Sequence, residues 1–428
     1  MLILLIFVAL LAMICLNVPI AVALAVSAVL GLLLTEGVGA LVTVALDMYD
    51  GSTKFSLIAI PMFVLAGAIM NAGGITDRLI NFVSALIGFV RGGLAMVNIG
   101  VSLFFAEISG SAVADVAALG SILIPQMKKR GYSGPFAAAV TSSSASLAII
   151  IPPSIPMILY GTSANASIEE LFVAGVVPGL LGAAGLMFVA YMFARRYNLP
   201  TEEAFNTKRL RETFVDALPA FALPVIILGG IFGGYVTATE AAGLAVLAAL
   251  GVGAWYRQMD FAHLRRAMLD GGMQTAVVMV LVAASVLMGG FLTRAQYPQQ
   301  MAEWMLGITD NKWVILLILN FFFLVVGFFL HSAAAIILVV PIVIPLIQAV
   351  GITIGTVHFG LVVTLNLAIG QQTPPVASVL ITSCAVARAN IWEVSKVNIW
   401  FVLVLLTVLM ICTYVPSIPM FLVEYFYR

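Results

Sequence analysis

The chain has 428 residues, of which 63% are hydrophobic and only 9% are charged, and its formal net charge at pH 7 is zero. A soluble domain carries about 25% charged residues, so the composition excludes a soluble protein, and the balanced charge gives no indication of a nucleic-acid partner. Apolar runs long enough to cross a bilayer recur along the whole sequence. They predict an all-α polytopic membrane protein whose first partner is the lipid bilayer.

The predicted membrane segments follow one another with short connections. The first is one long or broken segment over 2–34, kinked near Pro19 because proline removes a backbone donor. Further crossings are expected at 55–72, 134–160, 171–194, 219–234, 238–256, 273–292, 358–388 and 397–418. The one substantially polar stretch, 197–218, is predicted to be a cytoplasmic connector.

Two apolar stretches, 93–127 and 313–350, are too long for one crossing. Each carries small or polar residues at its centre, "ISGSAVAD" in the first and "FLHSAAA" in the second. Each stretch is therefore either two ordinary crossings or a re-entrant hairpin that enters and leaves on one side. With hairpins at both places, fifteen of the nineteen Lys and Arg residues fall on one face. This bias fits the positive-inside rule, although the count alone does not prove re-entrance.

The two halves of the sequence resemble each other. Each contains a hairpin-like stretch followed by a helix broken at a double proline, Pro152-Pro153 in the first half and Pro374-Pro375 in the second. An odd number of crossings separates the hairpins, so the halves are expected to be inverted repeats, as in secondary transporters. The predicted division is an N-terminal scaffold, a first repeat, scaffold helices with connectors, and a second repeat, at 1–54, 55–196, 197–270 and 271–428.

The broken segments "IIIPPSIPM" and "GQQTPPVAS" predict a binding site at mid-membrane. Irregular backbone is tolerated there only where protein or a water-filled site satisfies it. A broken helix offers carbonyl oxygens to a cation and the positive end of a helix dipole to an anion. Close helix packing explains either motif alone, but the same two features in the same order in both halves favour a site. Its hydroxyl and carbonyl oxygens suit sodium better than calcium or magnesium.

Several stretches also resemble the large membrane subunit of TRAP transporters (tripartite ATP-independent periplasmic transporters). They include "IPMFVLAGAIMNAGGITDRL", "SGSAVADVAALGSILIPQMKKRGY", "IIIPPSIPMILYG", "TATEAAGLAVL" and "VHFGLVVTLNLAIGQQTPPV". The resemblance implies a sodium-driven elevator in the bacterial inner membrane, with sodium as the coupling ion and no other cofactor. It also implies two partners, a small four-helix membrane subunit and a periplasmic substrate-binding protein.

The resemblance extends to the expected site residues. By position, Ser109, Gly110, Ser111 and Ser154 match the first-half ion and substrate region, and Gly370, Thr373 and Pro374 match the second-half break. Together with the residues around the breaks and the second tip, the expected ion and substrate site comprises Ser109, Gly110, Ser111, Pro152, Pro153, Ser154, His331, Ser332, Gly370, Gln371, Gln372, Thr373 and Pro374. Sodium is expected near Ser109, Ser111, Ser332 and Thr373.

The sequence departs from the family pattern at three positions, one of which is Gln372, an unusual polar residue beside the second break. His331 stands where the second hairpin usually carries Asp, and Ala377 stands where a glycine is expected. The hypothesis for His331 is that it contacts the substrate or couples transport to protons; the alternative is a hydrogen-bonded packing histidine. Of the other ionisable residues in apolar stretches, Asp115 and Glu240 are expected to be structural, at helix starts.

These observations predict sodium-coupled import of a small organic acid by alternating access. The first alternative is a single-component sodium–carboxylate symporter, which would need no binding protein. An intramembrane enzyme is a remote alternative, because the sequence has no HExxH or GxSG motif and only three histidines.

Overall fold

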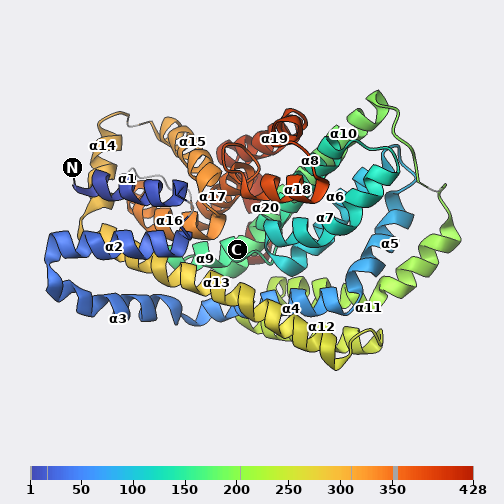
Figure 1. Cartoon of the computed structure of the whole chain (residues 1–428), viewed down its shortest axis with the longest axis horizontal. Coiled ribbons are helices and arrows are strands. Elements are labelled where there is room, and N and C mark those ends of the chain that lie inside the picture. The colour runs from blue at the N-terminus through green and yellow to red at the C-terminus, as the bar shows by residue number, and fades with distance from the viewer. Residues whose placement is uncertain (1, 17, 203, 310, 350–354, 428) are drawn as a thin grey trace.

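The computed structural model describes residues 2–16, 18–202, 204–309, 311–349 and 355–427. Within these ranges every regular element is a helix (Figure 1). Seven of the described helical segments are long and apolar enough to cross a membrane, at Phe55–Ala72, Ile168–Arg196, Thr207–Phe232, Ala238–Trp255, Phe261–Arg294, Lys312–Phe329 and Ile391–Tyr414. The prediction of an all-helical polytopic membrane protein is confirmed.

The N-terminal segment consists of two helices rather than one kinked helix. Helix α1 covers Leu2–Cys15 and α2 covers Ile20–Glu36, and the two pack against each other. Pro19 stands directly before α2, where its missing N–H costs no helical hydrogen bond. A short 3-10 turn then leads into α3, Leu41–Ser52, which was not predicted and which packs with α2 on α13.

The first half continues through a 3-10 turn at Phe55–Ile58 into the helices that carry the first hairpin and the first break. These are α4 (Ala59–Ala72), α5 (Ile75–Ile87), α6 (Gly93–Ser109), α7 (Ala112–Lys129), α8 (Gly134–Ala145), a 3-10 turn (Ser146–Ile149), α9 (Ile155–Ala164) and α10 (Ile168–Arg196). Helices α6 and α7 pack along each other as a helical hairpin. The predicted segment 134–160 is broken between the 3-10 turn and α9.

The middle of the chain holds α11 (Thr207–Phe232), α12 (Ala238–Trp255), α13 (Phe261–Arg294) and α14 (Tyr297–Leu306). The polar stretch 197–218, predicted to be a connector, is helical from Thr207 onward. The Asn206 side chain accepts hydrogen bonds from the backbone amides of Lys208 and Arg209, so α11 begins at Thr207 inside the polar stretch.

The second half repeats the order of the first with α15 (Lys312–Phe329), α16 (Ser332–Ala349), α17 (Thr356–Gly370), α18 (Ser378–Ala387), α19 (Ile391–Tyr414) and α20 (Ser417–Tyr427). The predicted segment 358–388 is broken between α17 and α18. Helix α15 packs mainly on α17, whereas α16 packs mainly on α13 and α9. Helices α15 and α16 therefore diverge from the short connection between Phe329 and Ser332.

The two halves interlock in a reciprocal way. Helix α7 of the first hairpin packs on α18 of the second broken helix, and α16 of the second hairpin packs on α9 of the first. Likewise α6 packs on α8 and α15 on α17. Most of these helices lie in the upper part of the molecule in Figure 1, whereas α3, α4, α11, α12 and α13 run along its lower side; α2 and α9 lie between the two groups.

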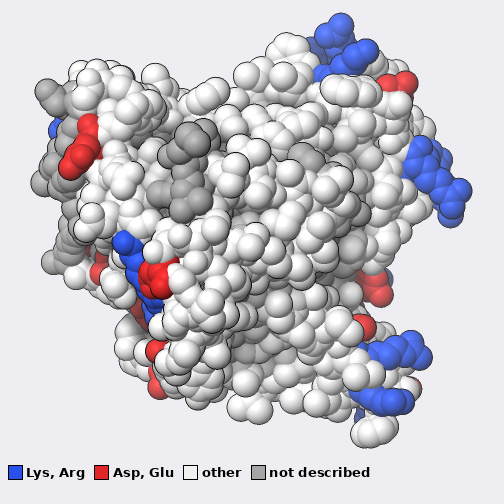
Figure 2. Space-filling model, turned by 60° about the vertical axis from the view of Figure 1, so that its left-hand side comes forward, with Lys and Arg blue, Asp and Glu red and all other residues white. Residues whose placement is uncertain are grey.

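The surface is typical of a membrane protein. In Figure 2 the visible Lys and Arg side chains gather mainly along the right-hand edge, and a broad uncharged surface separates them from a smaller charged group on the left. Large apolar side chains such as Val225, Leu247 and Phe188 are exposed on α11, α12 and α10. This distribution agrees with the predicted bias of basic residues toward one face.

Candidate functional site

The first break is shaped by Ser154. Its hydroxyl donates to the carbonyl of Ile149 at 2.6 Å and accepts from the amide of Met157 at 3.4 Å, so one side chain satisfies both ends of the interruption. Pro152-Pro153 is a cis peptide between the two helical pieces. Residues 150–154 are all buried, so protein rather than lipid surrounds the freed backbone, as an intramembrane break requires.

The second break spans 371–377 and is closed by its own polar side chains. Thr373 Oγ1 donates to the carbonyl of Ile369 at 2.9 Å, and Gln371 Nε2 donates to that of Leu367 at 3.3 Å. Ala377, which stands where a glycine was expected, adopts a left-handed backbone conformation with φ of 48°. Its amide donates to the carbonyl of Phe328, which ties the break to α15.

The tip of the first hairpin touches the first break. Gly110 has φ of +57°, and a Cβ built on it would lie 3.1 Å from the carbonyl oxygen of Pro153 and 3.2 Å from the amide nitrogen of Ile155. A side chain there would push the tip away from the break. Ser111 then caps α7 by accepting from the amide of Ala114. The side chain of Ser109 lies outside the described residues.

The tip of the second hairpin is built around His331. Its Nδ1 accepts from the amide of Ala333 at 3.4 Å, and its carbonyl accepts from the amide of Ala335. The imidazole therefore caps the start of α16. Because Nδ1 acts as an acceptor, the neutral ring carries its proton on Nε2, which is left to donate to a ligand.

Both tips and the second break meet at one cavity of about 580 Å³. Its wall on the hairpin side includes Gly110, Ser111, His331, Ser332 and Gln371. The opposite wall comes from α2, α4 and α13, with Ile20, Val64, Met273, Gln274, Val277, Val278 and Leu281. The cavity therefore lies between the interlocked hairpin and broken helices on one side and α2, α4 and α13 on the other.

The electrostatics of this cavity favour an anion. Four helices begin in its wall: α2 with Ile20 on the opposite side, and α7 with Ala112, α9 with Ile155 and α16 with Ser332 on the hairpin side. Each N-terminus carries about half a positive charge on unsatisfied amides. Among the described lining residues there is no Asp, Glu, Lys or Arg, and His331 is the one titratable side chain. Converging helix starts without a compensating carboxylate suit a small anion.

The remaining expected site residues lie behind this wall or beside it. Pro152, Pro153 and Ser154 are buried in the first break, and Thr373 and Pro374 are half-buried in the second. Gly370 faces Gly327 of α15, since a Cβ on Gly370 would come within 2.6 Å of the Gly327 Cα. None of these six residues lines the described cavity.

Gln372, the last expected residue, joins the two halves. Its Oε1 accepts from the Ser143 hydroxyl at 2.9 Å, and its carbonyl accepts from Asn398 Nδ2 at 2.9 Å. The Ser143 hydroxyl also lies 2.8 Å from Asn398 Oδ1, so its single proton is shared between these two acceptors. Because all three side chains are buried, this network connects α8, the second break and α19 without any charged group.

Sequence reasoning missed two asparagine clamps. Asn98 on α6 donates to Thr141 on α8 at 2.7 Å, and Asn366 on α17 donates to Asn320 on α15 at 2.7 Å. Each clamp ties the first helix of a hairpin to the first half of the following broken helix. The sequence does carry a sign of these clamps, namely a single asparagine inside an apolar run. A buried amide is costly unless it is hydrogen-bonded, so such an asparagine indicates a buried partner. Gln274, on the scaffold wall of the cavity, was missed as well.

The other ionisable residues have structural surroundings. Glu240 forms a capping box with Thr237 at the start of α12, and Asp115 is buried in the first turn of α7, as expected for both. His358 is buried and its Nε2 lies 2.6 Å from the carbonyl of Cys412. In the described part of the chain, no group of three His, Cys, Asp or Glu residues could hold a metal ion.

Two broken helices, two helix–tip–helix segments whose tips meet at one cavity, and a membrane-spanning helical fold are typical of a membrane transporter. A family model described as "Tripartite ATP-independent periplasmic transporter, DctM component" matches residues 7–418. The chain belongs to this family. It is therefore a multi-pass permease of the bacterial inner membrane and not an enzyme.

Individual relatives agree with this assignment. The C4-dicarboxylate TRAP transporter large permease DctM of Pseudomonas aeruginosa is 36% identical, with 88% of each chain covered. The 2,3-diketo-L-gulonate TRAP transporter large permease YiaN of Escherichia coli is 34% identical, with 89% of this chain and 92% of the relative covered. The isethionate TRAP transporter permease DctMQ of Oleidesulfovibrio alaskensis is 38% identical over 95% of this chain, which spans 64% of that protein.

A solved structure supports the fold alone. The YdaH transporter of Alcanivorax borkumensis, whose structure is described as having an unusual topology, superposes with a TM-score of 0.63. The alignment covers 89% of both chains at 14% identity.

Proposed function

We propose that this chain is the translocating subunit of a sodium-coupled importer of a small organic acid. The observation that carries the proposal is the cavity at the two hairpin tips, where three of the four helix N-termini meet on the hairpin side. The anionic group would bind at these helix starts and accept a hydrogen bond from Nε2 of His331. Relatives named for C4-dicarboxylate, diketogulonate and isethionate transport support an organic anion as the solute.

Sodium would bind beside the anion, at hydroxyl and carbonyl oxygens near Ser109, Ser111, Ser332 and Thr373. Oxygen ligands without a carboxylate suit a monovalent cation, and the broken helices supply such carbonyls. Bound sodium would order the tips and offset the negative charge of the solute. The described lining of the cavity contains no arginine that could pair with the anionic group of the solute. Sodium would therefore supply a positive charge that balances the solute in the cavity.

The movement we propose is an elevator. Within the inverted repeats 55–196 and 271–428, the hairpins and broken helices would form a mobile core. This core would slide against a scaffold that includes α2 and also α4 and α13, which lie wholly or mostly inside the repeats. The position of the cavity between these two groups of helices supports the idea. So do the asparagine clamps and the Gln372 network, because they bind hairpins and broken helices into one body.

The proposed partners are a small membrane subunit and a periplasmic binding protein. The relative named DctMQ supports the first, since its name combines both permease components, and the tripartite family description supports both.

The test is uptake of candidate organic acids into liposomes that contain this chain and its small membrane subunit. Uptake is measured with and without an inward sodium gradient, and with and without the binding protein. The proposal predicts uptake only when both are present. Sodium-driven uptake without the binding protein would instead identify a single-component symporter, and uptake driven by protons alone would contradict sodium coupling.

A further inference from the structure

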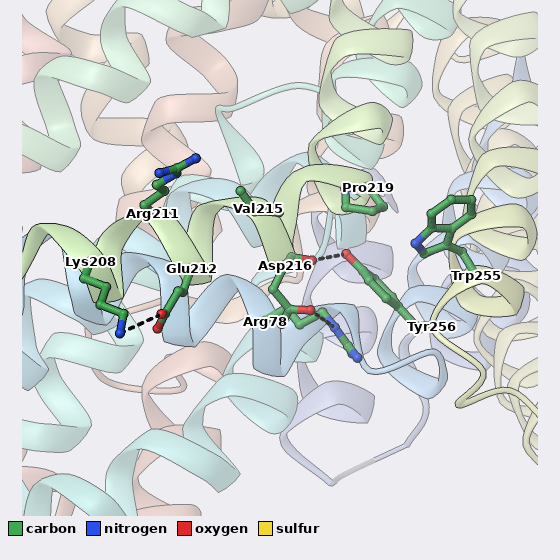
Figure 3. A pocket seen from close by; sticks show the side chains of 9 residues that line it. All are labelled: Arg78, Lys208, Arg211, Glu212, Val215, Asp216, Pro219, Trp255 and Tyr256. Atoms are coloured by element: carbon green, nitrogen blue, oxygen red, sulfur yellow. Dashed lines mark hydrogen bonds and ion pairs between the residues drawn. The ribbon is translucent and has the colours of Figure 1, made fainter.

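A second cavity, which shares no lining residue with the first, lies at the first turns of α5, the first half of α11 and the end of α12. It has a volume of about 770 Å³ and is lined by Arg78, Lys208, Arg211, Glu212, Val215, Asp216, Pro219, Trp255 and Tyr256 (Figure 3). Figure 3 shows Lys208, Glu212 and Asp216 following one another along α11, with Tyr256 and Trp255 at the other end of the pocket. Nothing in the transport proposal uses these residues.

Arg78 is held rigidly in this pocket. Its guanidinium lies 3.7 Å from the centre of the Tyr256 ring, and its Nη1 donates to the carbonyl of Gly74 at 2.9 Å. Its Nε forms an ion pair with Asp216 at 3.3 Å, and the Tyr256 hydroxyl donates to the Asp216 carbonyl at 2.7 Å. The Arg78 side chain is 17% exposed. A planar guanidinium fixed in this way is suited to receive an oxyanion.

The pocket has one positive charge in excess. Asp216 pairs with Arg78, and Glu212 lies 4.0 Å from Lys208 one helical turn away, whereas Arg211 has no ion-pair partner within the described residues. Exposed pairs such as Lys208–Glu212 are weak, so Lys208 can reorient toward a stronger anion. Two guanidinium groups and one ammonium group thus line the pocket, with Arg211 on one side of α11 and Arg78 on the other (Figure 3).

An apolar wall stands beside these charges. Val215, in the first half of α11, is 59% exposed, and Trp255, at the end of α12, is 77% exposed; both line the pocket. Tryptophan is enriched where the headgroups meet the hydrocarbon. The same face carries most of the basic residues of the chain, which places the pocket at the cytoplasmic leaflet, where anionic lipids attract basic side chains.

We propose that this pocket binds the phosphodiester headgroup of an anionic phospholipid. The phosphate would lie at the start of α11, where Arg211 and Lys208 can contact it, and the first carbons of the acyl chains would lie against Val215 on the same helix (Figure 3). Phosphate chemistry alone also fits a free phosphate ion, but the exposed apolar wall favours a lipid. A lipid held there would stabilise this part of the scaffold.

The experiment is native mass spectrometry of the full chain, titrated with short-chain phosphatidylglycerol, short-chain phosphatidylcholine or inorganic phosphate. The proposal predicts retained phosphatidylglycerol, little phosphatidylcholine and no competition by phosphate at equal concentration. Arg211→Gln should weaken phosphatidylglycerol binding about fivefold, as expected for one basic residue near an anionic surface. Arg211→Lys should keep most of the binding, because the charge remains.

The matched control is Arg265→Gln, which removes an exposed basic residue outside the pocket. It should leave binding unchanged. Arg211 is also exposed, so neither substitution threatens the fold. Equal losses in both variants would overturn the proposal in favour of non-specific attraction, and full competition by inorganic phosphate would overturn the lipid assignment. Loss of lipid binding on adding the small membrane subunit would make the pocket that subunit's docking surface and would equally contradict the proposal.

Discussion

The contact between Gly370 and Gly327 allows α17 and α15 to approach closely beside the second break, and we predict that Gly370→Ala separates them. A Cβ on Gly370 would meet Gly327 Cα at 2.6 Å, Gly327 C at 2.7 Å and the carbonyl of Leu324 at 3.0 Å. All three are backbone atoms, so no side chain can rotate away. Overpacking of this kind costs about 1–3 kcal/mol, and close helix approach through small residues is a main source of association in membranes.

The reciprocal substitution, Gly327→Ala, provides a smaller expected loss of stability for comparison. A Cβ on Gly327 would lie 3.1 Å from Gly370 Cα and 3.4 Å from Leu367 Cα, so Gly327→Ala should cost less. Gly243→Ala is the matched control, because Gly243 lies inside α12 with nothing within 4 Å of the added Cβ. This control should be neutral, or more stable by up to about 1 kcal/mol through helix propensity.

Thermal unfolding of the three purified variants in the same detergent tests the order. The unfolding midpoint should be highest for the Gly243 variant, lower for the Gly327 variant and lowest for the Gly370 variant. Sodium-driven uptake should also fall in the Gly370 variant. A Gly370→Ala variant as stable as the wild type would refute the close approach of the two backbones.

Three further predictions concern the second break and a helix start. Asn398→Leu removes the side-chain amide that donates to the Gln372 carbonyl at 2.9 Å. The buried carbonyl is then unpaired, so the free energy of unfolding should fall by about 1–3 kcal/mol. An unchanged unfolding midpoint would show that the hydrogen bond contributes nothing to stability. Ala377→Gly removes a side chain from a residue with φ of 48° and should raise stability by about 1 kcal/mol, whereas a lower midpoint would contradict the left-handed conformation. Asp260 caps α13: the backbone amide and the ring of His263 hydrogen-bond to its carboxylate, which holds the pKa of the Asp260 carboxyl below the usual 3.8. The cap is therefore intact above pH 3.8. It should be lost as the pH falls through the lower pKa that Asp260 has in the folded state. Hydrogen exchange at the first turn of α13 measures that loss, and exchange that does not change with acid would exclude the cap.

The sequence predicted the breaks and the tips well because proline and glycine act locally. Pro152-Pro153 and Pro374-Pro375 cannot continue a helix, and the structure interrupts both segments there. The prediction failed where an amphipathic or polar helix replaced a connector, as at α3 and the start of α11. Hydropathy finds segments long enough to cross the membrane but does not detect helices in the shorter stretches between them.

The cavity could be predicted only in part. Gly110, Ser111, His331, Ser332 and Gln371 were expected from their positions at tips and breaks, and they line one cavity. Its scaffold wall was not predicted, because Gln274 and its apolar neighbours on α13 read as an ordinary membrane helix. Which helix faces a site depends on tertiary packing, and hydropathy carries no information about it.

The most direct test of the central claim is whether solute occupies the cavity between the hairpin tips. Val278→Cys on the cavity wall and Val280→Cys outside it, each in a chain whose three native cysteines are replaced by serine, are labelled with a thiol reagent in liposomes. We predict that a transported organic acid together with sodium slows labelling at position 278 and leaves position 280 unchanged. Equal labelling of Cys at 278 with and without a solute that the same liposomes accumulate would contradict the account.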